Sequence, residues 1–140
     1  MAVNASTEYA LRALIEIYSS KEGLLSSQQL CKLQKLPKKF MEQLLGSLRA
    51  ADILQSTPGA RGGYSLARPA EEITFLDVMQ AVEDDSLDLT CAENKGEHCM
   101  GPDCRFSFFL EELSDKQNKL FDSYTLKKIA TMRKPRRKTT

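Results

Sequence analysis

Three cysteines lie close together in the second half of the chain, at Cys91, Cys99 and Cys104, and the only histidine, His98, lies among them. Seven and four residues separate the cysteines, whereas a regular zinc knuckle has closely spaced cysteine pairs and four protein ligands. Three thiolates in a loop can instead hold an iron–sulfur cluster if a fourth ligand comes from elsewhere. A cluster with an incomplete or hard fourth ligand is labile. The spacing therefore favours a sensing iron–sulfur site.

The fourth ligand has two candidates in the sequence. His98 is adjacent to Cys99, which makes simultaneous ligation sterically awkward, and a lone histidine in a polar loop usually faces solvent. Glu8 is the other candidate, although a glutamate in the first turn of a helix is also ordinary helix-dipole chemistry. The alternative to any cluster is a set of reduced cysteines that sense by thiol oxidation. Cys31 is separate, and its position beside Leu30 predicts a small buried hydrophobic residue.

Several function classes are disfavoured by the sequence. No run of 18 apolar residues exists, and residues 1–18 lack the layout of a signal peptide. We therefore expect a cytoplasmic protein with no membrane contact, in which thiols stay reduced. An enzyme is not expected, because no base and nucleophile are paired and the single histidine lies in a loop.

The charge of the chain is unevenly distributed. Residues 1–70 hold nine Lys and Arg against five Asp and Glu, residues 71–132 hold six against fourteen, and residues 133–140 hold five against none. A nearly neutral chain can thus present a basic front to phosphates. The acidic middle would not form that front.

A second group of candidate residues follows Pro37, which suits the first turn of a helix. A helix that enters the DNA major groove needs polar or basic side chains at its start, and a hairpin tip can reach a minor groove or a phosphate. Winged helices also serve as protein-interaction modules. The candidate DNA-binding residues are Lys38, Lys39, Glu42 and Gln43 on this helix, and Arg61 and Tyr64 in the hairpin.

The elements that must position these residues follow from periodicity. We expect a helix over 6–19 capped by Ser6 or Thr7, a second capped by Ser26 or Ser27 with Leu30 and Leu33 inward, and a third with Phe40, Met41, Leu44, Leu45 and Leu48 inward. Strands at 53–55 and 64–66 flank a turn-rich loop, and Thr74 caps a further helix. Helix, helix, helix and hairpin is the order of a winged helix. The expected fold class is mainly α with a small β-hairpin wing.

The C-terminal half predicts a different role. Periodicity is lost from Glu83 to Cys104, and such a long loop usually has a functional reason. A heptad-like stripe then predicts a long helix that pairs with a second copy; its members are Phe106, Leu110, Leu113, Gln117, Leu120 and Tyr124. The expected organisation is a winged helix-turn-helix domain at 1–83, a cysteine sensing loop at 84–104, a dimerisation helix and short C-terminal helix at 105–132, and a disordered basic tail at 133–140.

Four segments together resemble the Rrf2 family of winged-helix transcription regulators. They are Glu8-Tyr9-Ala10-Leu11-Arg12-Ala13-Leu14, Pro37-x-x-Phe40-Met41-Glu42-Gln43-Leu44-Leu45, Gly62-Gly63-Tyr64-x-Leu66-Ala67-Arg68 and Ile73-Thr74-x-x-Asp77-Val78. The resemblance covers roughly residues 5–130. Many relatives have Arg where this chain has Pro58, so minor-groove contact would fall to Arg61.

The resemblance implies a homodimer that binds double-stranded DNA at a palindromic operator. It also implies a 2Fe-2S or 4Fe-4S cluster at the three cysteines, whose state alters operator binding in response to nitric oxide, iron or redox. Some relatives with an acidic residue at the place of Glu8 use it as the fourth ligand, donated by the partner subunit. Glu8 is therefore preferred over His98.

Overall fold

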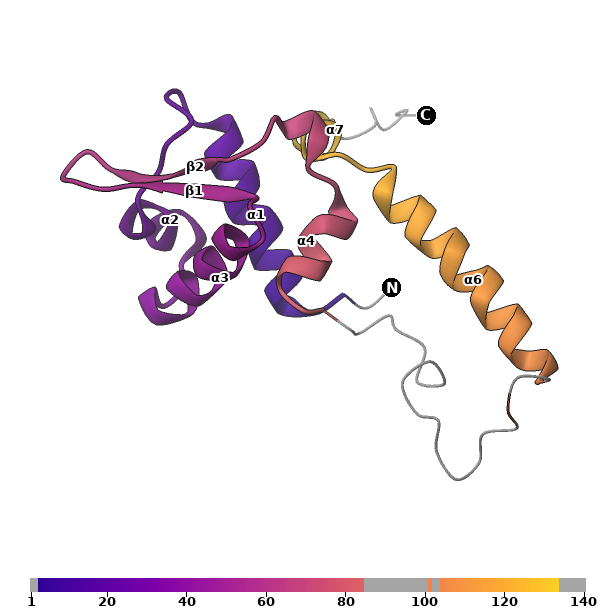
Figure 1. Cartoon of the computed structure of the whole chain (residues 1–140). Coiled ribbons are helices and arrows are strands. Elements are labelled where there is room, and N and C mark those ends of the chain that lie inside the picture. The colour runs from indigo at the N-terminus through magenta and orange to yellow at the C-terminus, as the bar shows by residue number, and fades with distance from the viewer. Residues whose placement is uncertain (1–2, 85–100, 102–103, 134–140) are drawn as a thin grey trace, which may run out of the picture.

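The computed structural model describes residues 3–84, 101 and 104–133 of the chain (Figure 1). An N-terminal body contains three helices, an antiparallel hairpin and two short helical segments, and a long helix then extends away from it (Figure 1). The elements are α1 (Ala5–Ser19), α2 (Ser27–Gln34), α3 (Lys38–Ala50), β1 (Leu54–Thr57), β2 (Gly63–Leu66), η1 (Ala70–Glu72), α4 (Phe75–Ala81), α6 (Arg105–Asp122) and α7 (Leu126–Thr131). The predicted mainly α fold with a β-hairpin wing is confirmed.

Side-chain caps begin most of these helices. Ser26 forms a reciprocal capping box with Gln29 at α2, and Thr74 forms one with Asp77 at α4, as their spacing indicates. The predicted cap of α1 was wrong. Asn4, not Ser6 or Thr7, accepts the hydrogen bond from the Ser6 amide at 2.7 Å. Asparagine is as good an N-cap as serine, and the Thr7 hydroxyl is engaged elsewhere.

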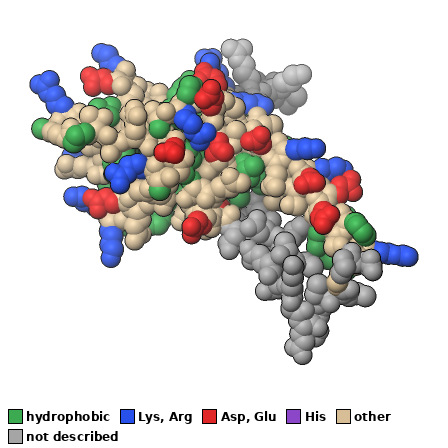
Figure 2. All heavy atoms as spheres, in the orientation of Figure 1, with side chains coloured by type: hydrophobic (Ala, Val, Ile, Leu, Met, Phe, Trp, Pro, Cys, Tyr) green, Lys and Arg blue, Asp and Glu red, His purple; other side chains and the backbone are tan. Residues whose placement is uncertain are grey.

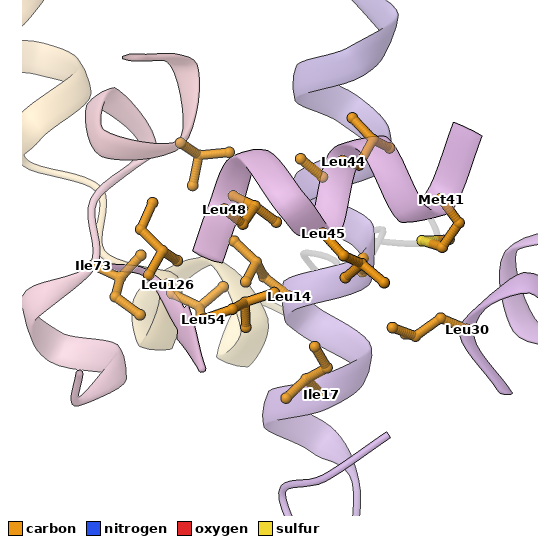
Figure 3. Close-up of a cluster of buried hydrophobic side chains, with 14 of the residues drawn as sticks. Leu14, Ile17, Leu30, Met41, Leu44, Leu45, Leu48, Leu54, Ile73 and Leu126 are labelled. Atoms are coloured by element: carbon orange, nitrogen blue, oxygen red, sulfur yellow. The ribbon is translucent and has the colours of Figure 1, made fainter. Parts of the chain in front are cut away.

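The core of the body lies where α1, α2 and α3 meet (Figure 3). The buried residues labelled there come from these three helices, from β1, from α7 and from the residue that follows η1. They are Leu14, Ile17, Leu30, Met41, Leu44, Leu45, Leu48, Leu54, Ile73 and Leu126. Burial of this many large aliphatic side chains is the main force that holds the helices together. The predicted inner face of α3 is confirmed at four of its five positions, and Phe40 is half-buried.

One predicted core residue of α2 is wrong. Leu33 is 53% exposed, whereas Leu30 is fully buried. The residue one turn after Leu30 is Gln34, which takes the inward position and donates a hydrogen bond to Glu16 on α1 at 3.2 Å. Cys31 is half-buried against the core, so it packs there without being enclosed.

The hairpin is joined to the body at Leu25, two residues before α2. Strands β1 and β2 pair antiparallel, with Leu54 opposite Leu66. Leu25 forms an isolated antiparallel bridge with Tyr64 of β2. Its amide donates to the Tyr64 carbonyl at 3.1 Å, and its carbonyl accepts from the Tyr64 amide at 2.7 Å. Gly63 makes this approach possible, since a Cβ atom there would lie 2.5 Å from the Leu25 carbonyl oxygen. The hairpin is therefore held to the body along β2, and its loop projects beyond this contact (Figure 1).

The two C-terminal helices pack on different parts of the body. Helix α6 packs mainly on α4, whereas α7 lies against α1 and η1 with Leu126 buried. Among the described residues, no helix is long and apolar enough to cross a membrane.

Candidate DNA interface and sensing residues

The start of α3 presents a polar face to solvent. Lys38, Lys39, Glu42 and Gln43 are all exposed there, while the opposite side of the helix is anchored in the core. Lys38 and Glu42 lie one turn apart with their charged atoms 3.8 Å apart, and both side chains remain largely in water. Such a pair contributes little to stability. These charges are thus available to an external partner.

The wing contacts the other end of α3. Arg61 is exposed in the loop between β1 and β2, and Gly62 closes the turn, since a Cβ atom there would lie 2.0 Å from the Thr57 carbonyl oxygen. Arg49 near the end of α3 reaches Ser56 on β1 at 3.5 Å. Figure 2 shows Lys and Arg side chains projecting from the end of the molecule where the hairpin, α2 and α3 lie.

Tyr64 differs from the other candidates. Its backbone forms both hydrogen bonds with Leu25, and its side chain is half-buried against the core. Tyr64 therefore anchors the wing to the body. Besides any contact with a ligand, Tyr64 thus has the structural role of holding the wing to the body.

Of the predicted cluster ligands on the cysteine segment, only Cys104 lies within the described residues; Cys91, His98 and Cys99 lie outside them. Cys104 is half-buried at the N-cap of α6. Its amide donates to the Gly101 carbonyl at 3.2 Å, and its carbonyl accepts from the Ser107 hydroxyl at 2.6 Å. The backbone at the start of α6 is thus ordered by local hydrogen bonds, and no group of three metal-binding side chains forms within the described part of the chain.

Glu8 is exposed in the first turn of α1, and its carboxylate makes no hydrogen bond or ion pair with the other described residues. Figure 1 shows the start of α6 and the first turn of α1 well apart. Within one chain, the structure therefore does not bring Cys104 and Glu8 together.

A polar contact beside Glu8 was not predicted from the sequence. The Asp84 carboxylate, which follows α4, accepts hydrogen bonds from the Thr7 hydroxyl at 2.5 Å and from the Asn4 amide at 3.0 Å. Thr7 is fully buried and Asp84 nearly so. The only signal in the sequence was a threonine on the inner side of the α1 helical pattern, which was interpreted as a cap.

Helix α6 has an uncovered apolar stripe. Phe106, Leu113 and Leu120 are 60%, 43% and 51% exposed, and they recur at the heptad spacing that the sequence indicated. We call these three residues the α6 stripe. Phe106 also contacts Phe109, with ring centroids 6.1 Å apart. Three large apolar side chains in a row on a solvent-facing helix are typical of a surface that a partner covers.

Comparison with known proteins adds a family relationship. The model of the Rrf2 family, described as iron-dependent transcriptional regulators, matches residues 3–132. The chain is 30% identical over 131 residues to the HTH-type transcriptional regulator IscR of Photorhabdus laumondii, across 92% of this chain and 79% of that protein. It is 33% identical over 84 residues to a Mycobacterium tuberculosis protein, and this match spans 52% of that protein's length.

A solved structure is similar over almost the whole fold. The crystal structure of Staphylococcus aureus CymR in its oxidized form matches with a TM-score of 0.70 and 26% sequence identity, over 96% of this chain and all of that chain. The overall fold is therefore similar to that of a solved protein.

Proposed function

Because the chain belongs to the Rrf2 family of transcriptional regulators, we propose that it is a homodimer that binds a palindromic operator under the control of an iron–sulfur cluster. Members of the family are regulators rather than enzymes, and they bind DNA. The observation that carries the proposal is the exposed polar start of α3, together with a wing that is hydrogen-bonded to the body.

The DNA contacts are assigned by chemistry. Lys39 and Lys38 suit guanine or phosphate oxygens, and Glu42 can accept from a cytosine amino group. Gln43 can form hydrogen bonds with adenine, and Arg61 at the wing tip can contact the DNA phosphate backbone or the minor groove. The basic excess of residues 1–70 supports this orientation, because phosphates are attracted to that end of the chain.

The α6 stripe supports the homodimer. A second copy placed against α6 would cover Phe106, Leu113 and Leu120 with the same residues of its own helix, as a two-fold interface requires. A two-fold dimer presents two copies of α3, and this symmetry matches a palindromic operator with half-sites one or more helical turns apart.

The donor chemistry fits an iron–sulfur cluster. Thiolates are soft ligands suited to iron, and Cys104 lies half-exposed at the start of an 18-residue helix, where negative charge is favoured. We assign Cys91, Cys99 and Cys104 as ligands, with Glu8 of the other subunit as the fourth and His98 as the lesser candidate. The Glu8 carboxylate is exposed and pairs with none of the other described residues, which supports this assignment. A bound cluster supplies a group that reacts with nitric oxide and oxidants.

The residues around Glu8 offer a route from such a site to the DNA interface. Glu8 follows Thr7, which is hydrogen-bonded to Asp84, so the first turn of α1 is tied to the end of α4. Helix α1 also packs on α2, α3, α7 and β2. A shift of α1 would therefore move the recognition helix α3 and the wing. It would thereby change the fraction of dimers that can bind the operator.

The first test is purification of the chain without oxygen, followed by its visible spectrum and its iron and sulfide content. We expect a brown protein whose affinity for a palindromic duplex, selected from a random-sequence pool, changes by about 10-fold or more on removal of iron. A coloured protein with identical affinity in both states would contradict control by the cluster.

The cross-subunit ligand has its own test. Glu8→Ala should make the visible bands more sensitive to chelator without altering the dimer, whereas Glu22→Ala, which removes an exposed carboxylate at the far end of α1, should not. Equal chelator sensitivity in both variants would return the fourth position to His98 or to a small external ligand.

A second candidate is regulation by thiol oxidation without a cluster. It is supported by the half-exposed thiol of Cys104 and by the similarity to a CymR that has been solved in an oxidized form. A colourless anaerobic protein with every thiol titratable, whose DNA affinity changes with peroxide, would establish this candidate.

A further inference from the structure

The turn between α6 and α7 is bonded to the strip of chain that precedes α4. Thr74 and Thr125 form an antiparallel bridge. On either side of it, the Phe75 amide donates to the Tyr124 carbonyl at 2.8 Å and the Leu126 amide donates to the Ile73 carbonyl at 2.7 Å. Short backbone bonds of this kind hold two segments in one register.

Buried side chains reinforce the bridge. The ring of Phe121, only 5% exposed, meets the ring of Phe75 edge to face with centroids 5.2 Å apart. Ile73 and Leu126 are fully buried beside it. Such aromatic pairs are favourable beyond their buried area. We call these contacts, made by Ile73, Thr74, Phe75, Phe121, Tyr124, Thr125 and Leu126, the joint.

The joint is the place where α6 is fixed to the winged body. Phe121 is the one buried residue that α6 contributes, and α4 is the element on which α6 mainly packs. The rest of α6 leaves the body (Figure 1). An 18-residue helix is about 27 Å long, so it acts as a lever that is held at one end.

The dimer in the proposed function forms along this lever, so the angle at the joint determines where each recognition helix lies. A rotation of about 10° at one end of a lever of about 27 Å moves the other end by about 5 Å. One base pair of DNA is about 3.4 Å long. A rotation of about 10° at the joint therefore produces a displacement larger than the length of one base pair.

We propose that the joint determines the half-site spacing that the dimer accepts, and that Phe121 is its principal positioning residue. Phe121 is buried against Phe75 and is not a member of the α6 stripe. It acts by preventing rotation of the winged body about the end of α6. The inference rests on the proposed function as a dimeric operator-binding regulator.

The test uses the full chain and the palindromic duplex that the wild-type protein selects from a random-sequence pool. One or two base pairs are then inserted at its centre. We expect the wild-type dimer to lose affinity by on the order of 100-fold for one insertion, because one half-site loses its base contacts. For Phe121→Ala the same insertion should cost less than about 5-fold, while sedimentation still gives a dimer.

Two control variants separate positioning from general loss of stability. Phe121→Tyr should keep most of the spacing requirement, because an aromatic ring can still meet Phe75 edge to face. Phe108→Ala removes a ring from the same helix at an exposed position outside the joint, and it should leave the insertion penalty unchanged. If Phe121→Ala does not fold, Phe75→Leu, which removes the edge-to-face pair and keeps an apolar side chain, gives the same measurement.

The outcomes are distinguishable. A folded, dimeric Phe121→Ala or Phe75→Leu variant that keeps the full insertion penalty would overturn the role of the joint and leave the proposed function intact. A wild-type protein that stays monomeric, or that selects no palindrome, would overturn the proposed function and the joint with it.

Discussion

The hydroxyl of Thr7 and the carboxylate of Asp84 lie 2.5 Å apart, although 77 positions separate them in the chain. The same carboxylate oxygen accepts from the amide of Asn4 at 3.0 Å. This contact joins the first turn of α1 to the segment that follows α4. It lies one residue from the proposed ligand Glu8, so the position of Glu8 depends on it.

Replacing Thr7 with Val should destabilise the fold. Valine has nearly the same shape but no hydroxyl, so the buried carboxylate loses a donor at a cost of about 1–3 kcal/mol in the free energy of unfolding. Thr7→Ser keeps the donor and should lose less. Urea denaturation followed by circular dichroism measures both. A Thr7→Val variant as stable as the wild type, with a loss only in Thr7→Ser, would show that packing of the methyl group, rather than the hydrogen bond, makes Thr7 important.

Replacing Gly63 with Ala should detach the wing. The added Cβ would lie 2.5 Å from the Leu25 carbonyl oxygen, so the two backbone hydrogen bonds between Leu25 and Tyr64 must lengthen. We expect a loss of about 1–3 kcal/mol in unfolding free energy and weaker operator binding. Gly46→Ala is the matched control, because that site in α3 has open space and should gain about 0.5–1 kcal/mol. A stable Gly63→Ala variant with unaltered DNA affinity would contradict this role.

The ion pair between Glu71 and Lys127, 3.0 Å apart, should be visible in a pH titration. The hydrogen bond from Lys127 lowers the pKa of Glu71 below 4.5, and the same bond raises the pKa of Lys127 above 10.5. The contribution of Glu71 to the stability of the fold is therefore present above its pKa in the unfolded chain, and it is lost as the pH falls through its pKa in the folded protein. The contribution of Lys127 is present below its pKa in the unfolded chain, and it is lost as the pH rises through its pKa in the folded protein.

NMR titration of the Glu71 carboxyl carbon checks this prediction. The pKa should return to its ordinary value in Lys127→Gln and also in high salt, since both side chains are exposed and screened. Lys116→Gln, which breaks a comparable pair with Glu112, should leave Glu71 unchanged. A Glu71 pKa that is insensitive to Lys127 would assign the shift to the backbone instead.

Replacing Lys39 with Ala should weaken operator binding and reduce its salt dependence. Loss of one phosphate contact lowers the slope of log affinity against log salt by about 0.9. Lys119→Ala removes the same charge from α6, away from α3, and should change neither quantity. Anisotropy titrations at several salt concentrations give both numbers. Identical slopes for the wild type and Lys39→Ala would exclude a phosphate contact by Lys39.

Replacing Leu113 with Glu should separate the subunits without unfolding them. Leu113 is already substantially exposed in one chain, so its folded monomer should tolerate a charge that a dimer interface would exclude. Asn118→Glu adds the same charge at an exposed position of α6 outside the stripe. Sedimentation velocity should give monomer for the first variant and dimer for the second. A dimeric Leu113→Glu variant would place the subunit interface on another surface.

Local chemistry was readable in the sequence alone. Helical periodicity predicted the inner face of α3, the expected caps at Ser26 or Ser27 and at Thr74 predicted where α2 and α4 begin, and the glycine-rich loop predicted the hairpin. These features depend on residues within a few positions of one another. The exposed start of α3 and the heptad spacing of α6 followed from the same periodicity.

Contacts between distant segments were decided only by the tertiary structure. Leu33 faces solvent because Gln34 takes the place beside Glu16, and Thr7 faces inward because Asp84 lies opposite it. The pairing of Ile73–Phe75 with Tyr124–Leu126, which fixes α6 to the body, had no local signal. Each of these contacts needs a partner that the chain path alone brings into place. Periodicity indicates which side chains prefer burial, but it does not indicate which of them meet.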